Sequence, residues 1–199
     1  MENKLYALSL NISKKVEKTI TGYKFNDDLN KIIAMSLFEL SRQHFNSILV
    51  LLDKNFNHSA GALLRPIIET HYRAQWIMFI ADETQVKNIS NGSIQFPKIT
   101  KIAKSLDKQF NTKSFSKEGF KHLHDLTHGG IEQILRFIDN TSIQSCYSSQ
   151  DIDYILETST KNICFFLSTT GLFLEDDNLL KLGNKMIIDF DNKIKEQRC

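Results

Sequence analysis

Residues 63–76, LLRPIIETHYRAQW, set two arginines, a glutamate, a histidine and a proline among the apolar residues of a helical run. Charged side chains are costly to bury, so each of them needs a partner or an opening to solvent. Four of these side chains fall within about 80° of one another on a helical wheel: Arg65, Glu69, Arg73 and Trp76. The stretch therefore predicts a helix with one apolar face and one polar–aromatic face. An Arg65–Glu69 ion pair that fixes helix packing and a substrate site are both compatible with it.

Pro66 predicts an irregularity in this helix. Proline has no N–H group to donate to the carbonyl of Ala62, and it disfavours α geometry at Arg65. The small residues that precede it, Ala60 and Gly61, ease a bend. We expect a kink here, with a free backbone carbonyl beside the charged row.

The rest of the chain predicts an all-α fold. Apolar residues recur with helical spacing almost everywhere, and no segment alternates as a strand would. We expect helices over residues 3–20, 27–54, 57–80, 82–91, 116–128, 131–138, 149–174 and 177–197, and one that begins at Pro97. The chain of 199 residues then forms a single-domain helical bundle, 1–199, of about eight or nine helices.

Composition narrows the class of protein. The net charge is only +2, which is not that of a polyelectrolyte binder. Three cysteines without metal-type spacing suggest free thiols in a reducing compartment. The most apolar run, residues 163–174, is too short to cross a bilayer. We expect a cytoplasmic protein that needs no membrane.

The charges are unevenly distributed along the chain. Between Lys87 and Lys121 there are eight lysines and two acids, whereas between Asp139 and Asp191 there are nine acids and three lysines. Four lysines of the basic segment fall within about 120° on a helical wheel: Lys98, Lys101, Lys104 and Lys108. They form either a solvated helix face or a stripe that binds RNA or a partner.

A second polar stretch is HLHDLTHGG, residues 122–130. His124 and His128 are four residues apart and so share one helix face. They could cap the end of the helix, act in acid–base chemistry or bind zinc. In a zinc site, Glu69 would be a candidate third ligand. Gly129 and Gly130 allow a new helix to begin at once, and its free N–H groups would form an anion pocket.

The motifs R-P-I-I-E-T-H-Y-R-A-Q-W, residues 65–76, and L-T-H-G-G, residues 126–130, resemble those of a bacterial family of uncharacterised helical proteins. The resemblance covers roughly residues 30–175. It extends distantly to AbiV-like abortive-infection proteins and to the HEPN superfamily, and so implies a HEPN-like bundle. HEPN ribonucleases carry an arginine, four to six residues and a histidine, which Arg65 and His71 match here.

Three hypotheses follow. The first is a metal-independent RNA endonuclease in phage defence or a toxin–antitoxin pair, whose catalytic residues we expect to be Arg65, Glu69, His71, His124 and His128. Arg73, Trp76, Gly129, Gly130 and the four lysines would bind its substrate. The second is a non-catalytic oligomerising or regulatory module whose charged cluster is structural. The third is a metal hydrolase that uses His124, His128 and Glu69.

The expected partners follow from the first two hypotheses. We expect no cofactor, RNA as a candidate substrate, and a cognate antitoxin or effector as a candidate protein partner. We also expect a homodimer, because HEPN-like proteins commonly pair and because apolar side chains of residues 164–175 point in most directions. A second subunit would then cover what one layer of this chain leaves exposed.

Overall fold

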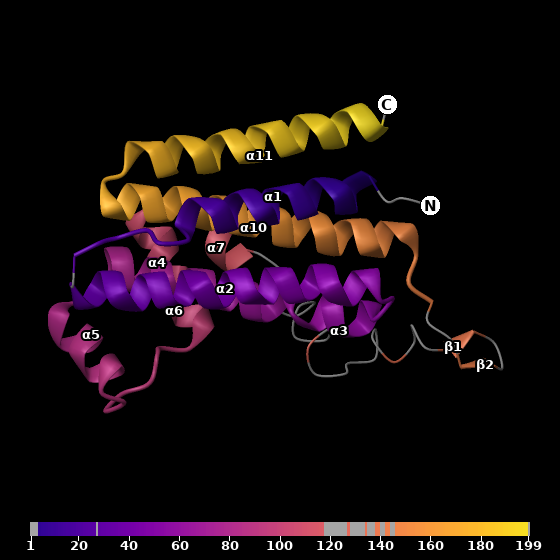
Figure 1. The fold of residues 1–199 in the computed structure, drawn as a ribbon. Helices are drawn as coiled ribbons and strands as arrows, with labels where there is room; N and C mark the ends of the chain where they lie inside the picture. The colour runs from indigo at the N-terminus through magenta and orange to yellow at the C-terminus, as the bar shows by residue number, and fades with distance from the viewer. Residues whose placement is uncertain are drawn as a thin grey trace.

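The computed structural model describes residues 4–26, 28–117 and 146–198, together with Thr127, Ile134, 138–139 and 142–143. It confirms an all-α domain (Figure 1). Its helices are α1 (Lys4–Ile20), α2 (Leu29–Asp53), α3 (Asn57–Ala62), α4 (Leu64–Phe79), α5 (Glu83–Ser90), α6 (Ile99–Gln109), α7 (Ser114–Lys117), α10 (Ser149–Leu174) and α11 (Asp177–Arg198). Strand β1 (Ile138–Asp139) pairs antiparallel with β2 (Ser142–Ile143).

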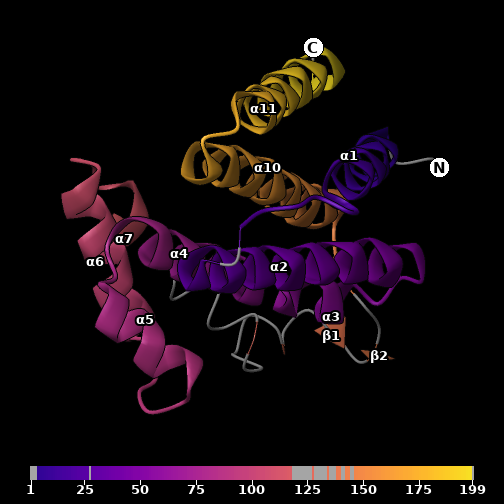
Figure 2. The ribbon, with the colours of Figure 1, turned by 60° about the vertical axis from the view of Figure 1, so that its left-hand side comes forward.

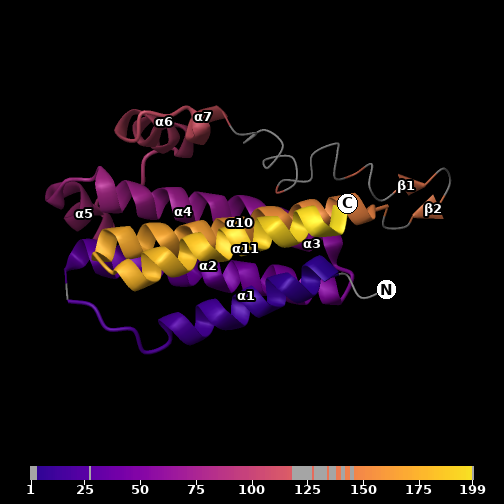
Figure 3. The same ribbon diagram turned by 90° about the horizontal axis from the view of Figure 1, so that it is seen from above.

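Four helices, α1, α2, α4 and α10, pack around a common core. Helix α11 lies along α10 as an outer layer (Figure 2). Helices α6 and α7 lie outside α4, on the side of the bundle opposite α1 (Figure 3). Phe38 of α2 meets Phe166 of α10 edge to face, with 4.9 Å between the ring centroids. Helix α4 is thus enclosed by α10 and α2 on one side and by α6 on the other.

Local sequence explains where the helices begin. Asp28 caps α2, and Asp82 and Ser148 each form a capping box that satisfies the first N–H groups of α5 and α10. Asp176 accepts hydrogen bonds from the N–H groups of Asn178 and Leu179 and so caps α11, whose first residue is acidic as expected.

The expected irregularity near Pro66 is present, but it lies three residues earlier. The single helix expected over residues 57–80 is divided at Leu63 into α3 and α4. Pro66 and Arg65 both lie in the first turn of α4, where proline is tolerated because the first N–H groups of a helix have no partner within that helix. Arg65 therefore keeps helical geometry, contrary to the expectation for a residue before proline.

Two other expected boundaries are wrong. Helix α6 begins at Ile99 rather than Pro97, because Lys98 has an extended ψ of 139° and acts as the N-cap. Ile138, expected at the end of a helix, instead pairs with Ile143 in the hairpin, so the expectation of no strand also fails there. The helix expected over 116–128 overlaps α7, which ends at Lys117 in the described part of the chain. Most of residues 118–128 lie outside the described residues.

The apolar residues of α10 are mostly covered within one chain. Phe166 and Leu167 are fully buried, while Phe165 and Leu172 stay exposed. Helices α1, α2, α4 and α11 thus cover most of this helix within one chain, and a second subunit that covers the two exposed side chains stays a prediction.

The contact of α10 with α11 depends on two glycines. A Cβ atom at Gly171 would lie 2.3 Å from the backbone nitrogen of Leu180, and one at Gly183 would lie 2.5 Å from that of Ser168. Both distances are shorter than real Cβ contacts, and the obstructing atoms are backbone atoms that cannot move alone. The two helices can approach this closely only because these positions lack a side chain.

We predict that Gly183→Ala lowers the free energy of unfolding by about 1–3 kcal/mol, because α11 must move away from α10. Helix propensity alone would change it in the opposite direction, by about 0.5–1 kcal/mol. Urea unfolding measures the difference, with Lys185→Ala, on the exposed side of the same helix, as the control. A Gly183→Ala protein as stable as the control would contradict the close approach.

Candidate functional site

The charged row of α4 is a three-residue ion-pair cluster. Arg65 Nε donates to Glu69 Oε1 at 2.6 Å, and an Arg73 Nη atom donates to Glu69 Oε2 at 2.9 Å. The Glu69 side chain is 14% exposed, and those of Arg65 and Arg73 are 23% and 34% exposed. The Arg65–Glu69 pair is one of the two arrangements that the i,i+4 spacing indicated, whereas the Arg73–Glu69 pair was not expected. The carboxylate orients two guanidinium groups that reach solvent.

The aromatic part of this face is covered rather than open. The guanidinium carbon of Arg73 lies 5.7 Å from the ring centroid of Phe96, within cation–π range. The same ring meets Trp76, which is 5% exposed and therefore does not present a surface for a substrate. Trp76 was expected to bind substrate; instead it is part of the core that holds the segment before α6 against α4.

Thr127 links the two sequence motifs. Its hydroxyl donates a hydrogen bond of 3.3 Å to the carbonyl of Ala62. Pro66 has no N–H group to donate to this carbonyl, which the sequence therefore predicted to be free of its helical partner. The T-H-G-G motif therefore begins at a residue that contacts the last residue of α3, three residues before Arg65.

His71 does not belong to the charged face. Its side chain is 1% exposed, and its ring stacks on Phe166 of α10 with 4.4 Å between the centroids. Gln75 contacts its Nε2 atom at 2.9 Å. Burial lowers the pKa of His71 to about 3, against a smaller opposing effect of Asn162. A neutral, enclosed imidazole cannot reach a substrate beside Arg65, so the expected pairing of Arg65 with His71 as a catalytic motif is not supported by this geometry.

The lysines of α6 form an exposed row. Lys98, at the N-cap, and Lys101, Lys104 and Lys108 all face solvent, while Ile102, Ala103 and Leu106 face the core. Within the described part of the chain, none of these four lysines forms a salt bridge with an acidic side chain.

The one acidic residue of α6, Asp107, takes part in the junction with α7. Asp107 accepts the N–H groups of Phe115 and Ser116 and so caps α7. Burial alone would raise the pKa of Asp107, but the hydrogen bonds from Ser116 and Phe115 hold it below its usual value. The carboxylate is thus occupied at the α6–α7 junction.

Four predicted site residues lie outside the described residues: His124, His128, Gly129 and Gly130. Their convergence with Arg65 and Glu69 stays a prediction. Among the residues that the structure describes, no group of three histidine, cysteine, aspartate or glutamate side chains is placed to hold a metal ion. Within the same part, no helix has the length and apolar character needed to span a bilayer.

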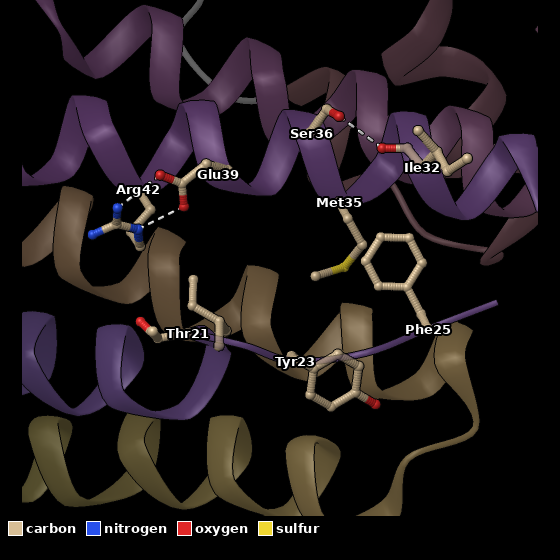
Figure 4. Close-up of a pocket in the computed structure, with 9 residues that line it drawn as sticks. Thr21, Tyr23, Phe25, Ile32, Met35, Ser36, Glu39 and Arg42 are labelled. Atoms are coloured by element: carbon tan, nitrogen blue, oxygen red, sulfur yellow. Dashed lines mark hydrogen bonds and ion pairs between the residues drawn. The ribbon is translucent and has the colours of Figure 1, made fainter. Parts of the chain in front are cut away.

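A separate pocket of about 540 Å³ lies between α2 and the residues that follow α1 (Figure 4). Phe25, Ile32 and Met35 form its apolar wall. At its other end Arg42 donates two hydrogen bonds of 2.7 Å to Glu39. The sequence offered no signal for this pocket, because the residues after α1 meet α2 only in the folded chain.

Comparison with known proteins places the chain in a family. The model of a family of unknown function, DUF6988, matches residues 38–179. The chain belongs to this family. The matched region contains the Arg65–Glu69–Arg73 cluster, the lysine row of α6 and residues 122–130, and it leaves out α1 and most of α11. No curated protein and no solved structure matches the chain, so the resemblance to AbiV-like and HEPN proteins stays a prediction.

Two residues of this site escaped the sequence analysis. Phe96, which contacts Arg73, lies in a loop with no periodic pattern. Thr127 lies within the L-T-H-G-G motif, but its partner, the Ala62 carbonyl, is 65 residues away in the sequence, so the contact could not be inferred from spacing. The free carbonyl itself was a usable signal, because a buried acceptor calls for a donor.

We predict that Glu69→Gln lowers the free energy of unfolding by roughly 1–3 kcal/mol, because two half-buried guanidinium groups lose their carboxylate. The control is Lys181→Gln, in the exposed i,i+4 pair with Asp177, for which we expect less than about 0.5 kcal/mol. Urea unfolding at pH 7 compares the two. Equal losses would show that the cluster behaves as an ordinary surface ion pair.

We predict that His71 makes stability fall with acidity. The unfolded chain binds a proton at this residue near pH 6.5 and the folded chain only near pH 3, so acid favours the unfolded state between these values. From pH 7 to pH 5 this linkage costs about 2 kcal/mol. His71→Gln should remove that part of the loss in urea unfolding at the two pH values. A variant with the wild-type loss would contradict the buried neutral state.

Proposed function

We propose that this protein binds RNA along the lysine row of α6 and the arginines of α4, and cleaves it without a metal ion. The observation that carries the proposal is the junction at Phe96. Its ring contacts the Arg73 guanidinium, and Lys98 follows two residues later as the first lysine of the row. This short separation between the Arg73 contact and the first lysine supports one cationic surface that includes residues of both helices.

Phosphate recognition is the chemistry that suits this surface. Guanidinium groups bind phosphate oxygens in a planar, bidentate manner, and Glu69 holds Arg65 and Arg73 in place for it. The lysines supply charge along the backbone of a nucleic acid without reading its sequence. With two guanidinium groups and one carboxylate, the α4 cluster keeps a net positive charge.

The cleavage step we propose uses the 2′-hydroxyl of RNA. A histidine, His124 or His128, takes the proton of the 2′-hydroxyl as its oxygen attacks the adjacent phosphorus. The bond from phosphorus to the 5′-oxygen breaks, a protonated imidazole gives that oxygen its proton, and a 2′,3′-cyclic phosphate remains. Arg65 stabilises the charge that develops on the phosphate. His71 is left out of this step because it is buried.

One observation favours a second candidate, a non-catalytic module. Glu69 accepts a hydrogen bond from each arginine, so the cluster also satisfies itself as a structural network. In that case the lysine row would bind a partner or RNA without turnover. The two candidates differ in one property, the cleavage of bound RNA.

We predict that Lys101→Gln/Lys104→Gln/Lys108→Gln weakens binding of a labelled single-stranded RNA and reduces its salt slope by about 0.7 for each phosphate that the variant no longer neutralises. The matched control is Lys185→Gln/Lys193→Gln/Lys195→Gln, which removes three exposed lysines of α11. Fluorescence anisotropy at several salt concentrations measures both. An unchanged slope in the α6 variant would remove the lysine row from the site.

The same titrations, run with EDTA and analysed on gels, test cleavage. Arg65→Ala should slow cleavage by about 10²–10³-fold, and DNA of the same sequence should remain intact because it lacks the 2′-hydroxyl. Loss of activity in either His124→Ala or His128→Ala identifies the proton carrier. Binding without any cleavage would establish the non-catalytic module, and cleavage only after metal is added would establish a metal hydrolase.

A further inference from the structure

The centre of helix α1 meets the rest of the bundle through hydroxyl groups. Four residues of this helix are buried, and the middle two are serines: Leu5, Ser9, Ser13 and Val16. Thr160 of α10 donates a hydrogen bond of 2.8 Å to the Ser9 hydroxyl, and Ser13 donates one of 2.6 Å to Asn46 of α2. Water can replace such hydrogen bonds, so they hold a helix less firmly than buried apolar side chains do.

The packing around α1 is also incomplete. The helix lies at the edge of the bundle, alongside α2 and α10 (Figure 3). Its last residue, Ile20, lines the pocket of Figure 4. A second pocket, of about 830 Å³, lies between the first turns of α1, the end of α2 and the start of α10, and a third, of about 160 Å³, lies between α1 and α11. Side chains that border such spaces lose dispersion contacts on that side.

The surface that α1 covers belongs to the matched family region, whereas α1 itself does not. Residues 38–179 include all of α10 and most of α2, and with them both hydrogen-bond partners of the α1 serines, Asn46 and Thr160. The match begins after α1 has ended. The groove is therefore formed by the family fold, and the helix that fills it lies outside the match.

We propose that α1 is a displaceable strap, residues 4–20, which leaves the groove between α2 and α10 as one unit while the rest of the bundle stays folded. Residues 21–26 have no regular secondary structure, and Gly22 among them has a φ of 74°, so the chain after the strap can change direction without breaking a helix. The proposal is independent of the RNA site, which lies on α4 and α6.

The remaining core does not need the strap. Phe166 of α10 meets Phe38 of α2 at 4.9 Å between the ring centroids and stacks on His71 of α4 at 4.4 Å. These contacts join α2, α4 and α10 without any residue of α1. The strap can therefore open as a local event, at a lower free energy than unfolding of the whole chain.

The uncovered groove suits an amphipathic helix of the same kind as α1. Leu52 and Leu156 line it at one end, and Asn46 and Thr160 offer hydrogen bonds at its centre. A helix that binds there needs an apolar residue followed by small hydroxyl residues at four-residue spacing, the pattern of the strap itself. The strap thus acts as an internal competitor of a partner protein that presents such a helix.

The Cys164 thiol reports the opening, in a chain with Cys146→Ser and Cys199→Ser. Cys164 is fully buried one turn after Thr160, and burial raises its pKa to about 12, against a smaller lowering effect of Lys15 of α1. Iodoacetamide should label it by way of the local opening, at a rate that changes little with urea below the unfolding transition, because one helix exposes little surface. A rate that follows unfolding of the whole chain would overturn the proposal.

Disulfide clamps identify which helix moves. Oxidised Ser9→Cys/Thr160→Cys joins the strap to α10 and should slow labelling of Cys164 by at least about tenfold. The matched control is oxidised Ser168→Cys/Asn184→Cys, which joins α10 to α11 where the wild-type side chains also form a hydrogen bond of 2.8 Å. This clamp should leave the rate unchanged. Slowing by the α11 clamp alone would show that the thiol is reached from the other side and would overturn the proposal.

Val16→Asp should open the strap, because it places a carboxylate in the buried stripe of α1. Labelling of Cys164 should then accelerate by about tenfold or more. Asn11→Asp, at an exposed position of the same helix, is the matched control and should keep the wild-type rate. Circular dichroism and urea unfolding measure what remains folded. Loss of the helices beyond α1 in the Val16→Asp protein would show that α1 belongs to the cooperative core, and would overturn the strap.

A peptide added to the Val16→Asp protein tests whether the groove accepts a helix from another molecule. The synthetic peptide of residues 4–20, in excess, should fill the opened groove and slow labelling of Cys164 again. The same peptide with Val16→Asp should give no protection, because it carries the carboxylate that opened the strap. Equal protection by both peptides, or none by either, would overturn the groove as a helix-binding site.

Discussion

Helix α4 is enclosed on two sides, and this constraint accounts for most of the polar chemistry of the protein. Buried or half-buried polar groups require partners, because their desolvation is otherwise uncompensated. Glu69 meets this requirement for Arg65 and part of it for Arg73, whose Nε atom is buried without a partner, and Gln75 meets part of it for His71. The two sides of the helix thus accommodate polar groups differently. One side carries paired charges that reach solvent, and the other carries a neutral, buried imidazole.

Pro66 extends this constraint to a distant part of the chain. It leaves the Ala62 carbonyl without its helical donor, and Thr127 supplies the missing hydrogen bond. A single residue without an N–H group thereby connects the α3–α4 junction to the second motif. This connection, rather than the charged row alone, is what makes residues 122–130 relevant to the chemistry proposed at Arg65.

The two outer faces of the bundle differ in character. On one side, the lysine row of α6 is exposed, and the one acidic residue of that helix, Asp107, is turned into the α6–α7 junction as a cap. On another, the exposed residues that follow one another at helical spacing along α2 are uncharged: Leu29, Ile32, Ser36, Leu40, Gln43, Ser47 and Val50. A polyanion suits the first face, and the second lacks the positive charge that such a partner requires.

Local interactions were predictable from the sequence by itself. Helical periodicity indicated the all-α fold and the bounds of α10, and the four-residue spacing of Arg65 and Glu69 indicated their ion pair, because these features depend on neighbours within one or two turns. Tertiary structure alone decided the rest. His71 is buried because α10 lies against it, and Trp76 is covered because Phe96 returns to α4. Helical spacing assigns a side chain to a face, but only the packing of the other helices determines whether that face meets solvent.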